Sequence, residues 1–343
     1  MKKRWLAAMV LAGAVLCAAG CGQEAEPASA QEEAGGKEAS EGAESGADDK
    51  ITIGVTMQGN QSGFVQYFTS AMYEYQATKA PDVDMEVVFA DDDASKQFSQ
   101  VETFISKGVD AIIMHPVDMT QSVAAVDLAV DAGIPLITIS NMSASPDVTA
   151  HVGCDDVEAG ELQMQRIIDV CGPDAKVAYV DATLGHSAQV QRAEGYNNVL
   201  AENPGVELVI HDTGNWSPEE SMRLVENWLQ SGKDLDAILC MADCQLTGVI
   251  TAVENAGQMD KIKLAGMDCD AVILQAIEEG KVDCSIWQDG IAEGENALRI
   301  AIEAAQGKEV SDMIIPYEVC TKDNVEEYKA KAAKRDELAK KYF

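Results

Sequence analysis

Short apolar runs that alternate with segments of helical spacing are the feature that most constrains how this chain folds. The alternation begins at Ile51 and continues for most of the remaining sequence. Strands that alternate with helices are typical of parallel sheets covered by helices on both faces, so the pattern predicts an α/β fold. The predicted strands are 51–56, 85–90, 111–114, 135–139, 149–152, 176–180, 206–210, 237–241, 262–266 and 282–286. The predicted helices are 64–78, 97–107, 122–132, 189–202, 221–229 and 247–256.

The two halves of this region resemble each other. A strand-like run, 110–114, is followed by a helix that ends at Ala132-Gly133, and the run 236–240 is followed by one that ends at Ala256-Gly257. Glycine suits such helix ends because it tolerates a left-handed backbone. We expect two similar doubly wound lobes, with a ligand beyond the carboxyl ends of their strands. The alternative is one wide sheet, but strongly twisted open sheets rarely reach ten strands.

The first 50 residues differ from the rest. Lys2, Lys3 and Arg4 precede an apolar run, 6–19, and small residues precede Cys21. This segment resembles a bacterial lipoprotein signal, which implies removal of residues 1–20 and lipidation of Cys21. The apolar run is about 14 residues, shorter than the roughly 20 that a membrane span needs. The alternatives are an ordinary secretory signal and a short membrane anchor.

Residues 21–50 have the composition of a linker. After Cys21 they contain no aromatic residue and are dominated by Glu, Ala, Gly and Ser. Such a segment buries too little apolar surface to offset its conformational entropy. We therefore predict an acidic flexible linker ahead of a folded region that begins at Ile51.

The chain is strongly acidic, with a formal net charge of −33. Residues 51–343 alone hold 20 basic and 49 acidic residues. Binding of nucleic acid needs a basic surface, so this balance argues against a nucleic-acid partner. It argues equally against an anionic ligand, unless an arginine is placed to receive one.

Seven cysteines remain after Cys21, and an odd number leaves at least one unpaired. The closest two, Cys240 and Cys244, do not form a CxxC pair and have no histidine nearby. Zinc sites normally show a CxxC pair or cysteines with histidines nearby. We predict buried free thiols and no metal site.

A series of short motifs occurs in a fixed order between residues 51 and 320. The motifs are Ile51-Thr52-Ile53-Gly54-Val55, Lys107-Gly108-Val109-Asp110-Ala111, His115-Pro116-Val117-Asp118, Ala132-Gly133-Ile134-Pro135, Gly185-His186-Ser187, Arg192-Ala193-Glu194-Gly195-Tyr196, Met267-Asp268 and Trp287-Gln288. In the order and spacing of these motifs the chain resembles the ribose-type periplasmic sugar-binding proteins, the substrate receptors of sugar ABC importers.

The resemblance implies the type I periplasmic binding fold, in which two lobes are joined by three crossovers and close on a ligand. The crossovers would lie near Asp155, Asp289 and Pro316. The N-terminal lobe would hold 51–154 plus 290–316, and the C-terminal lobe 155–289 plus 317–343. The last segment, 325–343, is predicted to be a surface helix with no chemistry of its own.

The resemblance also implies a function. The protein would be a monomeric lipoprotein on the outer face of the bacterial cytoplasmic membrane. It would capture a small neutral sugar or polyol and deliver it to an ABC permease and its ATPase. The alternative partner is a membrane sensor kinase that reads the liganded receptor.

Several site residues follow from the motifs. Phe64 and Trp216 match stacking positions, and Arg192, Asp268 and Gln288 match hydrogen-bonding positions. An aromatic face suits the C–H surface of a sugar, and charged groups give its hydroxyls the stronger hydrogen bonds. The remaining predicted ligand-binding residues are Gln61, His115, Ser140, Asn141 and Asp243.

Some of these residues have structural alternatives. Phe64 and Trp216 are of a kind often buried for packing. Arg192 has a surface partner available in Glu194. Asp268 is placed to cap a helix beginning near Ala271.

The chain departs from the ribose-type pattern at two places. Ser140-Asn141 stands where the pattern has an Asp-Arg pair, and Ala242 stands where it usually has asparagine. Ribose is therefore not the expected ligand. His186 either faces the ligand or lies near the hinge or surface.

Two other classes of protein are disfavoured. Candidate catalytic groups, such as Cys244 beside Asp243, belong to no assembled motif, and the chain lacks G-x-S-x-G, P-loop and dinucleotide fingerprints. We therefore predict neither an enzyme nor a cofactor. Repressors of the lac type share the fold, but they need a helix-turn-helix where this chain has an apolar segment and an acidic linker.

Overall fold

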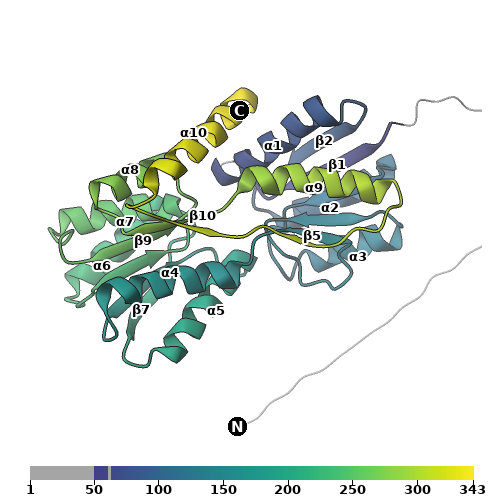
Figure 1. Cartoon of the computed structure of the whole chain (residues 1–343). Helices are drawn as coiled ribbons and strands as arrows, with labels where there is room; N and C mark the ends of the chain where they lie inside the picture. Colours follow the sequence, from purple (N-terminus) through teal and green to yellow (C-terminus); the bar gives the residue numbers. More distant parts are fainter. Residues whose placement is uncertain (1–49, 61–62) are drawn as a thin grey trace, which may run out of the picture. The chain divides into compact units, whose positions relative to one another are not determined.

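The computed structural model describes residues 50–60 and 63–343 (Figure 1). Cys21, the predicted signal and the predicted linker up to residue 49 lie outside the described residues, as does Gln61. The described residues form two separate six-stranded sheets, each flanked by helices.

The first sheet has the strand order β11-β5-β4-β3-β1-β2, and its pairs are parallel. Helices α1, α2, α3 and α9 belong to this lobe. The elements are β1 (Thr52–Met57), α1 (Gly63–Lys79), β2 (Asp84–Phe89), α2 (Ala94–Lys107), β3 (Ala111–Met114), α3 (Val123–Asp131), β4 (Leu136–Ile139), β5 (Ala150–Gly153), α9 (Gly290–Ala305) and β11 (Met313–Ile314).

The second sheet has the order β12-β10-β9-β8-β6-β7, and only β12 runs antiparallel to its neighbour. Its elements are α4 (Asp156–Cys171), β6 (Lys176–Asp181), α5 (Ser187–Glu202), β7 (Glu207–Thr213), α6 (Pro218–Gln230), β8 (Ala237–Cys240), α7 (Asp243–Asn255), β9 (Lys263–Met267), α8 (Ala271–Glu279), β10 (Cys284–Trp287), β12 (Glu318–Thr321) and α10 (Val325–Tyr342).

The two sheets share one internal order, since β5-β4-β3-β1-β2 corresponds to β10-β9-β8-β6-β7. The α/β prediction and the likeness of the two halves are confirmed, and the alternative of one wide sheet is wrong. The central strands β3, β4, β8 and β10 are buried along their whole length. This burial on both faces explains why they appear as continuous apolar runs rather than alternating ones.

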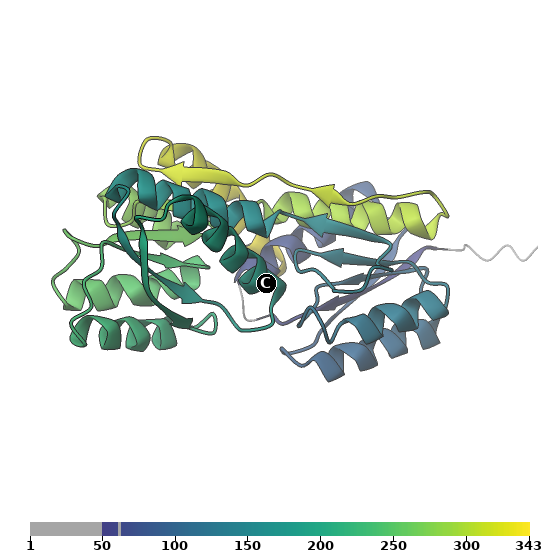
Figure 2. The ribbon, with the colours of Figure 1, turned by 90° about the horizontal axis from the view of Figure 1, so that it is seen from below.

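The chain passes between the two sheets at three places. After β5 it enters α4, whose first backbone amides are capped by the Asp155 carboxylate. After β10 it enters α9, where Asp289 caps the amide of Ala292. Between β11 and β12 it passes through residues 315–317, a stretch that Figure 2 shows running from one sheet to the other. Aspartate is favoured at helix starts, so two of the passages end in well-capped helices.

The sequence did not predict α4, α9, β11 or β12. Helix α9 contains Gly290 and Gly294, and glycine is a poor helix former. The close packing of α9 on α1 requires Gly294, because a side chain there would meet the backbone carbonyl of Phe68. Strand β11 has two residues and carries no periodic pattern. In these places tertiary contacts override local propensity.

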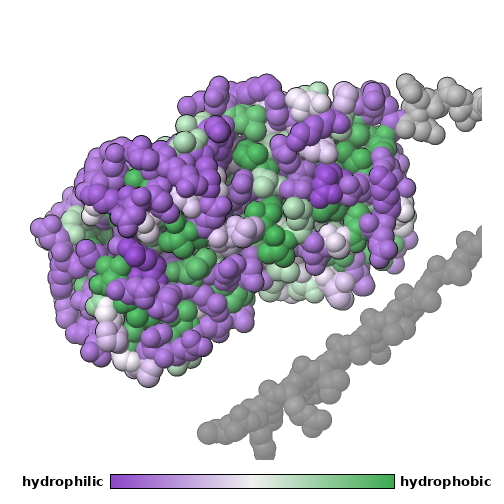
Figure 3. Space-filling model, viewed as in Figure 1, coloured by the Kyte–Doolittle hydropathy of each residue, from purple (hydrophilic) through white to green (hydrophobic). Residues whose placement is uncertain are grey.

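The seven cysteines of the described residues are all unpaired, and five are buried, so the prediction of buried free thiols is confirmed for these five. Groups of three or more metal-binding side chains do not occur in the described ranges. None of the described helices has the length and apolar character needed to cross a membrane. Hydrophilic residues cover most of the face in Figure 3, with apolar residues in patches between them.

Helices α4 and α5 approach each other closely at two glycines. A Cβ at Gly160 would meet the backbone carbonyl of Arg192, and one at Gly195 would meet that of Val157. Both neighbours are backbone atoms of regular helix and have little freedom to move. This contact fixes the part of α5 that carries Arg192.

We expect Gly195→Ala to destabilise the protein by roughly 1–3 kcal/mol, because the added methyl group overpacks a rigid helix contact. Chemical denaturation followed by circular dichroism measures the change. The control is Asn197→Ala on the exposed face of the same helix, which should change stability by less than about 0.5 kcal/mol. Equal stability of the two variants would contradict the packing argument.

Candidate ligand-binding site

Backbone strain marks the carboxyl ends of four strands. Among the described residues, seven residues other than glycine have a positive φ, and all lie in loops that follow β2, β4, β7 or β9. They are Asp91, Asp92, Ser140, Asn215, Trp216, Asp268 and Cys269. Strain of about 1–3 kcal/mol per residue persists where the surroundings impose it, commonly at functional sites. Strands β2 and β4 correspond to β7 and β9, so both lobes are strained at equivalent positions.

The first lobe contributes a group of neutral polar side chains. Asn141 is buried and donates to the backbone carbonyl of Pro116 at 2.8 Å and to Gln58 Oε1 at 3.2 Å. The buried ring of His115 packs edge-on against Phe68, and its Nδ1 has no hydrogen-bond partner in the described chain. These groups follow the carboxyl ends of β1, β3 and β4, where a ligand of a doubly wound sheet is expected.

His186 brings the second lobe against this group. Its Nε2 lies 2.8 Å from Asn141 Nδ2 and 3.0 Å from Gln58 Oε1. One tautomer accepts the asparagine proton and the other donates to the glutamine, so a neutral ring satisfies only one of the two at a time. Nδ1 of His186 is buried without a partner in the described residues. The hypothesis that His186 is exposed is wrong, because the side chain is buried between the lobes.

Both histidines are held neutral. Burial lowers the pKa of His186 to about 3, and the nearby Arg192 adds to this effect. Burial also lowers the pKa of His115 to about 3, with a smaller contribution from His186. Neutral imidazoles at physiological pH offer one donor and one acceptor each, which suits hydroxyl groups.

Arg192 on α5 is the centre of a buried polar network. Its Nε donates to Asp156 Oδ1 at 2.8 Å, and its NH1 group donates to the backbone carbonyl of Met241. Its NH2 group reaches Gln288 Oε1 and the Tyr317 hydroxyl, both at 3.3 Å. The alternative of a surface pair with Glu194 is wrong, since the buried partner is Asp156.

Gln288 links this network to the first lobe. Its Nε2 donates to Glu293 Oε1 at 2.8 Å and to Ser140 Oγ at 3.3 Å. Burial, with a further contribution from Asp156, raises the pKa of Glu293 to about 8. The site therefore holds little unbalanced charge at neutral pH.

The two predicted aspartates differ in their surroundings. Asp243 is fully buried inside the second lobe, where its carboxylate accepts from the Ser285 hydroxyl and the Asp270 amide. Asp268 lies at the end of β9 with φ 108°, and burial, followed by the charge of Asp270, raises its pKa to about 8. The first residue before α8 is Asp270, so the alternative that Asp268 caps this helix is wrong.

The predicted stacking residues are both half-buried. Phe64 lies in the first turn of α1 with its ring edge-on to Phe68. Trp216 follows β7 with its ring edge-on to His186, 5.1 Å between centroids. Neither is a fully buried core aromatic, so each keeps a surface for another molecule.

The structure thus brings together Ser140, Asn141, Arg192 and Gln288, with Trp216 beside His186. Asp243 instead lies inside the second lobe, where it stabilises the loop before α8 by hydrogen bonding. Sequence reasoning missed Gln58, Asp156, Glu293 and Tyr317 as members of the polar network. Gln58 directly follows β1, and a polar residue at the end of a strand could have indicated it in the sequence. Asp156, Glu293 and Tyr317 join the network through contacts between segments far apart in the chain, which no local sequence pattern indicates.

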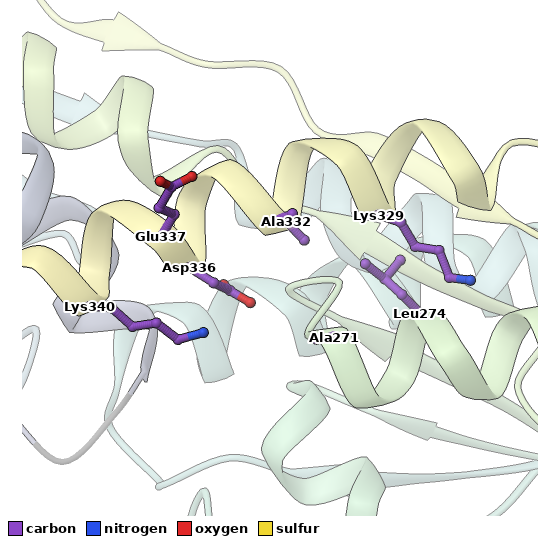
Figure 4. Close-up of a pocket in the computed structure, with 8 residues that line it drawn as sticks. Ala271, Leu274, Lys329, Ala332, Asp336, Glu337 and Lys340 are labelled. Carbon is purple, nitrogen blue, oxygen red and sulfur yellow. The ribbon is translucent and has the colours of Figure 1, made fainter.

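A cavity of about 470 Å³ lies elsewhere, between α8 and α10 (Figure 4). It is lined by Ala271, Leu274, Lys329, Ala332, Ala333, Asp336, Glu337 and Lys340. None of the predicted ligand-binding residues lines it. Its open, charged rim differs from the enclosed site expected for a small neutral ligand.

Two α/β lobes, joined by three passages and bringing buried polar residues together between them, define a two-lobed solute receptor. The model of the periplasmic binding protein domain family matches residues 53–309. The chain belongs to this family, whose members act outside the cytoplasm.

Individual relatives agree with this assignment. A solved ABC transporter solute-binding protein from Bacillus halodurans C-125, with bound myo-inositol, is 38% identical with a TM-score of 0.80; the match covers 84% of this chain and 100% of that one. The xylitol-binding protein of Mycolicibacterium smegmatis is 31% identical over 81% of this chain and 79% of its own length. The ribose import binding protein of Bacillus subtilis is 29% identical over 66% and 73%. These relatives are binding proteins, not enzymes.

We expect Glu293→Gln to reduce the loss of stability that raising the pH causes. The pKa of Glu293 is 4.5 in the unfolded chain and about 8 in the folded protein. Between these pH values only the folded protein keeps the proton, so the free energy of unfolding falls as the pH rises from about 4.5 through 8. An amide stays neutral and removes this contribution. Chemical denaturation at pH 5 and pH 8 measures the difference.

The control for this experiment is Glu309→Gln on the exposed loop after α9. It should keep the pH dependence of the unmodified protein. A Glu293→Gln variant whose stability changes between pH 5 and 8 as much as that of the control would contradict the neutral state of Glu293.

Proposed function

We propose that this protein is the receptor of an ABC importer for a cyclic polyol of the inositol type. The observation that carries the proposal is the buried polar network between the lobes. Its one strong charge pair, Arg192 with Asp156, is already balanced within the protein. Among the atoms left without a partner in the described residues, Nδ1 of His115 and Nδ1 of His186 belong to neutral rings and suit hydroxyls.

The departure from the ribose-type pattern supports a polyol over ribose. Ser140-Asn141 replaces a charged pair with a hydroxyl and an amide, which match a ring bearing hydroxyls on every carbon. Two of the three relatives support a polyol, since one is solved with myo-inositol and another is named a xylitol-binding protein, while the third is named for ribose import. The proposal includes hinge closure on the ligand, and its support is that groups of both lobes contribute to the site.

Binding of myo-inositol tests this proposal directly. We expect the protein to bind myo-inositol more tightly than ribose in calorimetric titrations. Asn141→Leu should weaken binding by about 1–3 kcal/mol, since a buried polar partner is lost without a change in side-chain size. Asn197→Leu on an exposed helix face is the control and should bind as the unmodified protein does. Undetectable binding of myo-inositol would refute the proposed ligand.

We also propose that the receptor is anchored through Cys21 and delivers its ligand to a permease with an ATPase. The support for the anchor is the sequence of residues 1–21, and the support for the importer is the nature of the relatives. None of the three relatives is described as the receptor of a membrane sensor, so the sensor alternative is not favoured.

Cys21→Ala tests the anchor. We expect the unmodified protein to sediment with membranes after expression in a bacterium, and the variant to move into the soluble or secreted fraction because no lipid is attached. Cys244→Ala, at a half-buried cysteine far along the chain, serves as the control and should stay with the membranes. Release of both proteins, or of neither, would contradict the anchor.

A further inference from the structure

The C-terminal helix α10 carries one arginine that differs from its other basic residues. The sequence predicted a surface helix without chemistry, and its lysines are indeed at least partly exposed, but Arg335 is only 1% exposed. A charged side chain is almost never so deeply buried unless it is paired. The description of α10 as a surface helix is therefore wrong at Arg335.

Arg335 holds the backbone of the loop that carries Asp268. Its NH1 group donates to the carbonyl of Asp268 at 2.7 Å, and its NH2 group donates to that of Cys269 at 3.3 Å. The same guanidinium lies 3.5 Å from the Asp270 carboxylate. A planar guanidinium with several donors can hold adjacent carbonyls at once, which a lysine cannot do in the same way.

These carbonyls belong to strained residues. Asp268 has φ 108° and Cys269 has φ 52°, conformations that side-chain-bearing residues rarely adopt. Hydrogen bonds from a buried charged donor are among the stronger ones in proteins and offset such strain. The loop conformation determines where the Asp268 carboxylate lies, and that carboxylate is close enough to Arg192 to interact with its charge.

Arg335 also contacts the first lobe. Its guanidinium lies 3.9 Å from the ring centroid of Tyr67 on α1 and 5.1 Å from that of Trp287 at the end of β10. The Tyr67 hydroxyl donates to Asp270 Oδ1 at 3.4 Å. Helix α1 also carries Phe64, a predicted stacking residue, so Arg335 connects groups of both lobes that border the site.

The far end of α10 reaches the same helix of the first lobe. The Tyr342 ring stacks on Tyr73 with 5.3 Å between centroids, and its hydroxyl donates to Glu74 at 2.8 Å. The start of α10 packs on the second lobe through Tyr328. Figure 1 shows the helix extending from the second lobe toward α1.

We infer that Arg335 is a positioning residue of the ligand site: by holding the strained loop at 268–269 and packing on Tyr67, it places the Asp268 carboxyl group for the ligand when the lobes are closed. The inference rests on the proposed function. It assigns to the C-terminal helix a part in binding, exerted through Asp268 rather than by contact with the ligand.

The test uses the full-length protein and myo-inositol as the probe. We expect Arg335→Met to weaken binding by about tenfold or more, since the loop loses its donors. Arg335→Lys keeps the charge but not the planar group, and it should recover part of the affinity. The matched control is Lys334→Met, which removes the same charge from the neighbouring, exposed position of α10. It should bind as the unmodified protein does.

The pH dependence of binding separates positioning from a general loss of structure. The groups facing Asp268 are Asp270 before α8, Arg192 on α5, Arg335 on α10, and the Asp243 carboxyl and Cys244 thiol on α7. Removing Arg335 removes a positive charge, so the midpoint of the pH dependence should move to higher pH in Arg335→Met. In Asp268→Asn the part of the dependence that responds to Arg335 should disappear, while any contribution of Glu293, whose pKa is also raised to about 8, remains.

Each outcome decides the inference. Reduced affinity with a raised midpoint supports it. An Arg335→Met protein that binds with unchanged affinity and midpoint overturns it while leaving the proposed function intact. If Arg335→Met does not fold, Arg335→Lys decides: reduced affinity with normal stability supports the inference, and unchanged affinity overturns it. If the unmodified protein binds no myo-inositol, both the proposed function and the inference fail.

Discussion

The buried ion pair between Arg192 and Asp156 is the interaction on which the rest of the structure depends. Asp156 follows the first passage between the sheets, Gln288 lies in the second and Tyr317 in the third, and the guanidinium contacts all three residues. Removing one member of such a pair leaves an uncompensated buried charge, which costs about 3–5 kcal/mol. The three passages and the candidate site therefore share one electrostatic centre.

This centre explains why the surrounding groups are neutral. A second free charge in the same buried volume would raise the desolvation penalty without a partner to offset it. The environment keeps both histidines unprotonated and shifts the pKa of Glu293 and Asp268 upward for the same reason, burial. An uncompensated charge on a bound solute would meet the same desolvation penalty in this interior.

Much of the fold was predictable from the sequence. The alternation of β3 and β4 with α3, and of β8 and β9 with α7, is a local pattern that burial on both faces of a parallel sheet produces. Helix α9 and strand β11 were not predictable, because glycine-mediated packing and pairing with β5 decide them, and both are long-range effects. The site was predicted only in part, since Ser140, Asn141 and Asp268 were identified through the family resemblance rather than from local patterns. Arg335 lies 67 residues beyond Asp268 in the chain, so no local pattern could indicate their contact.

The contacts among Gln58, Asn141 and His186 have one further consequence. In the structure these side chains already satisfy much of each other's hydrogen bonding across the two lobes. A solute that enters must offer more hydrogen bonds than the protein makes with itself, or closing around it gains nothing. Under the proposed function, a ring with a hydroxyl group on every carbon meets this condition better than a solute with fewer hydroxyl groups does.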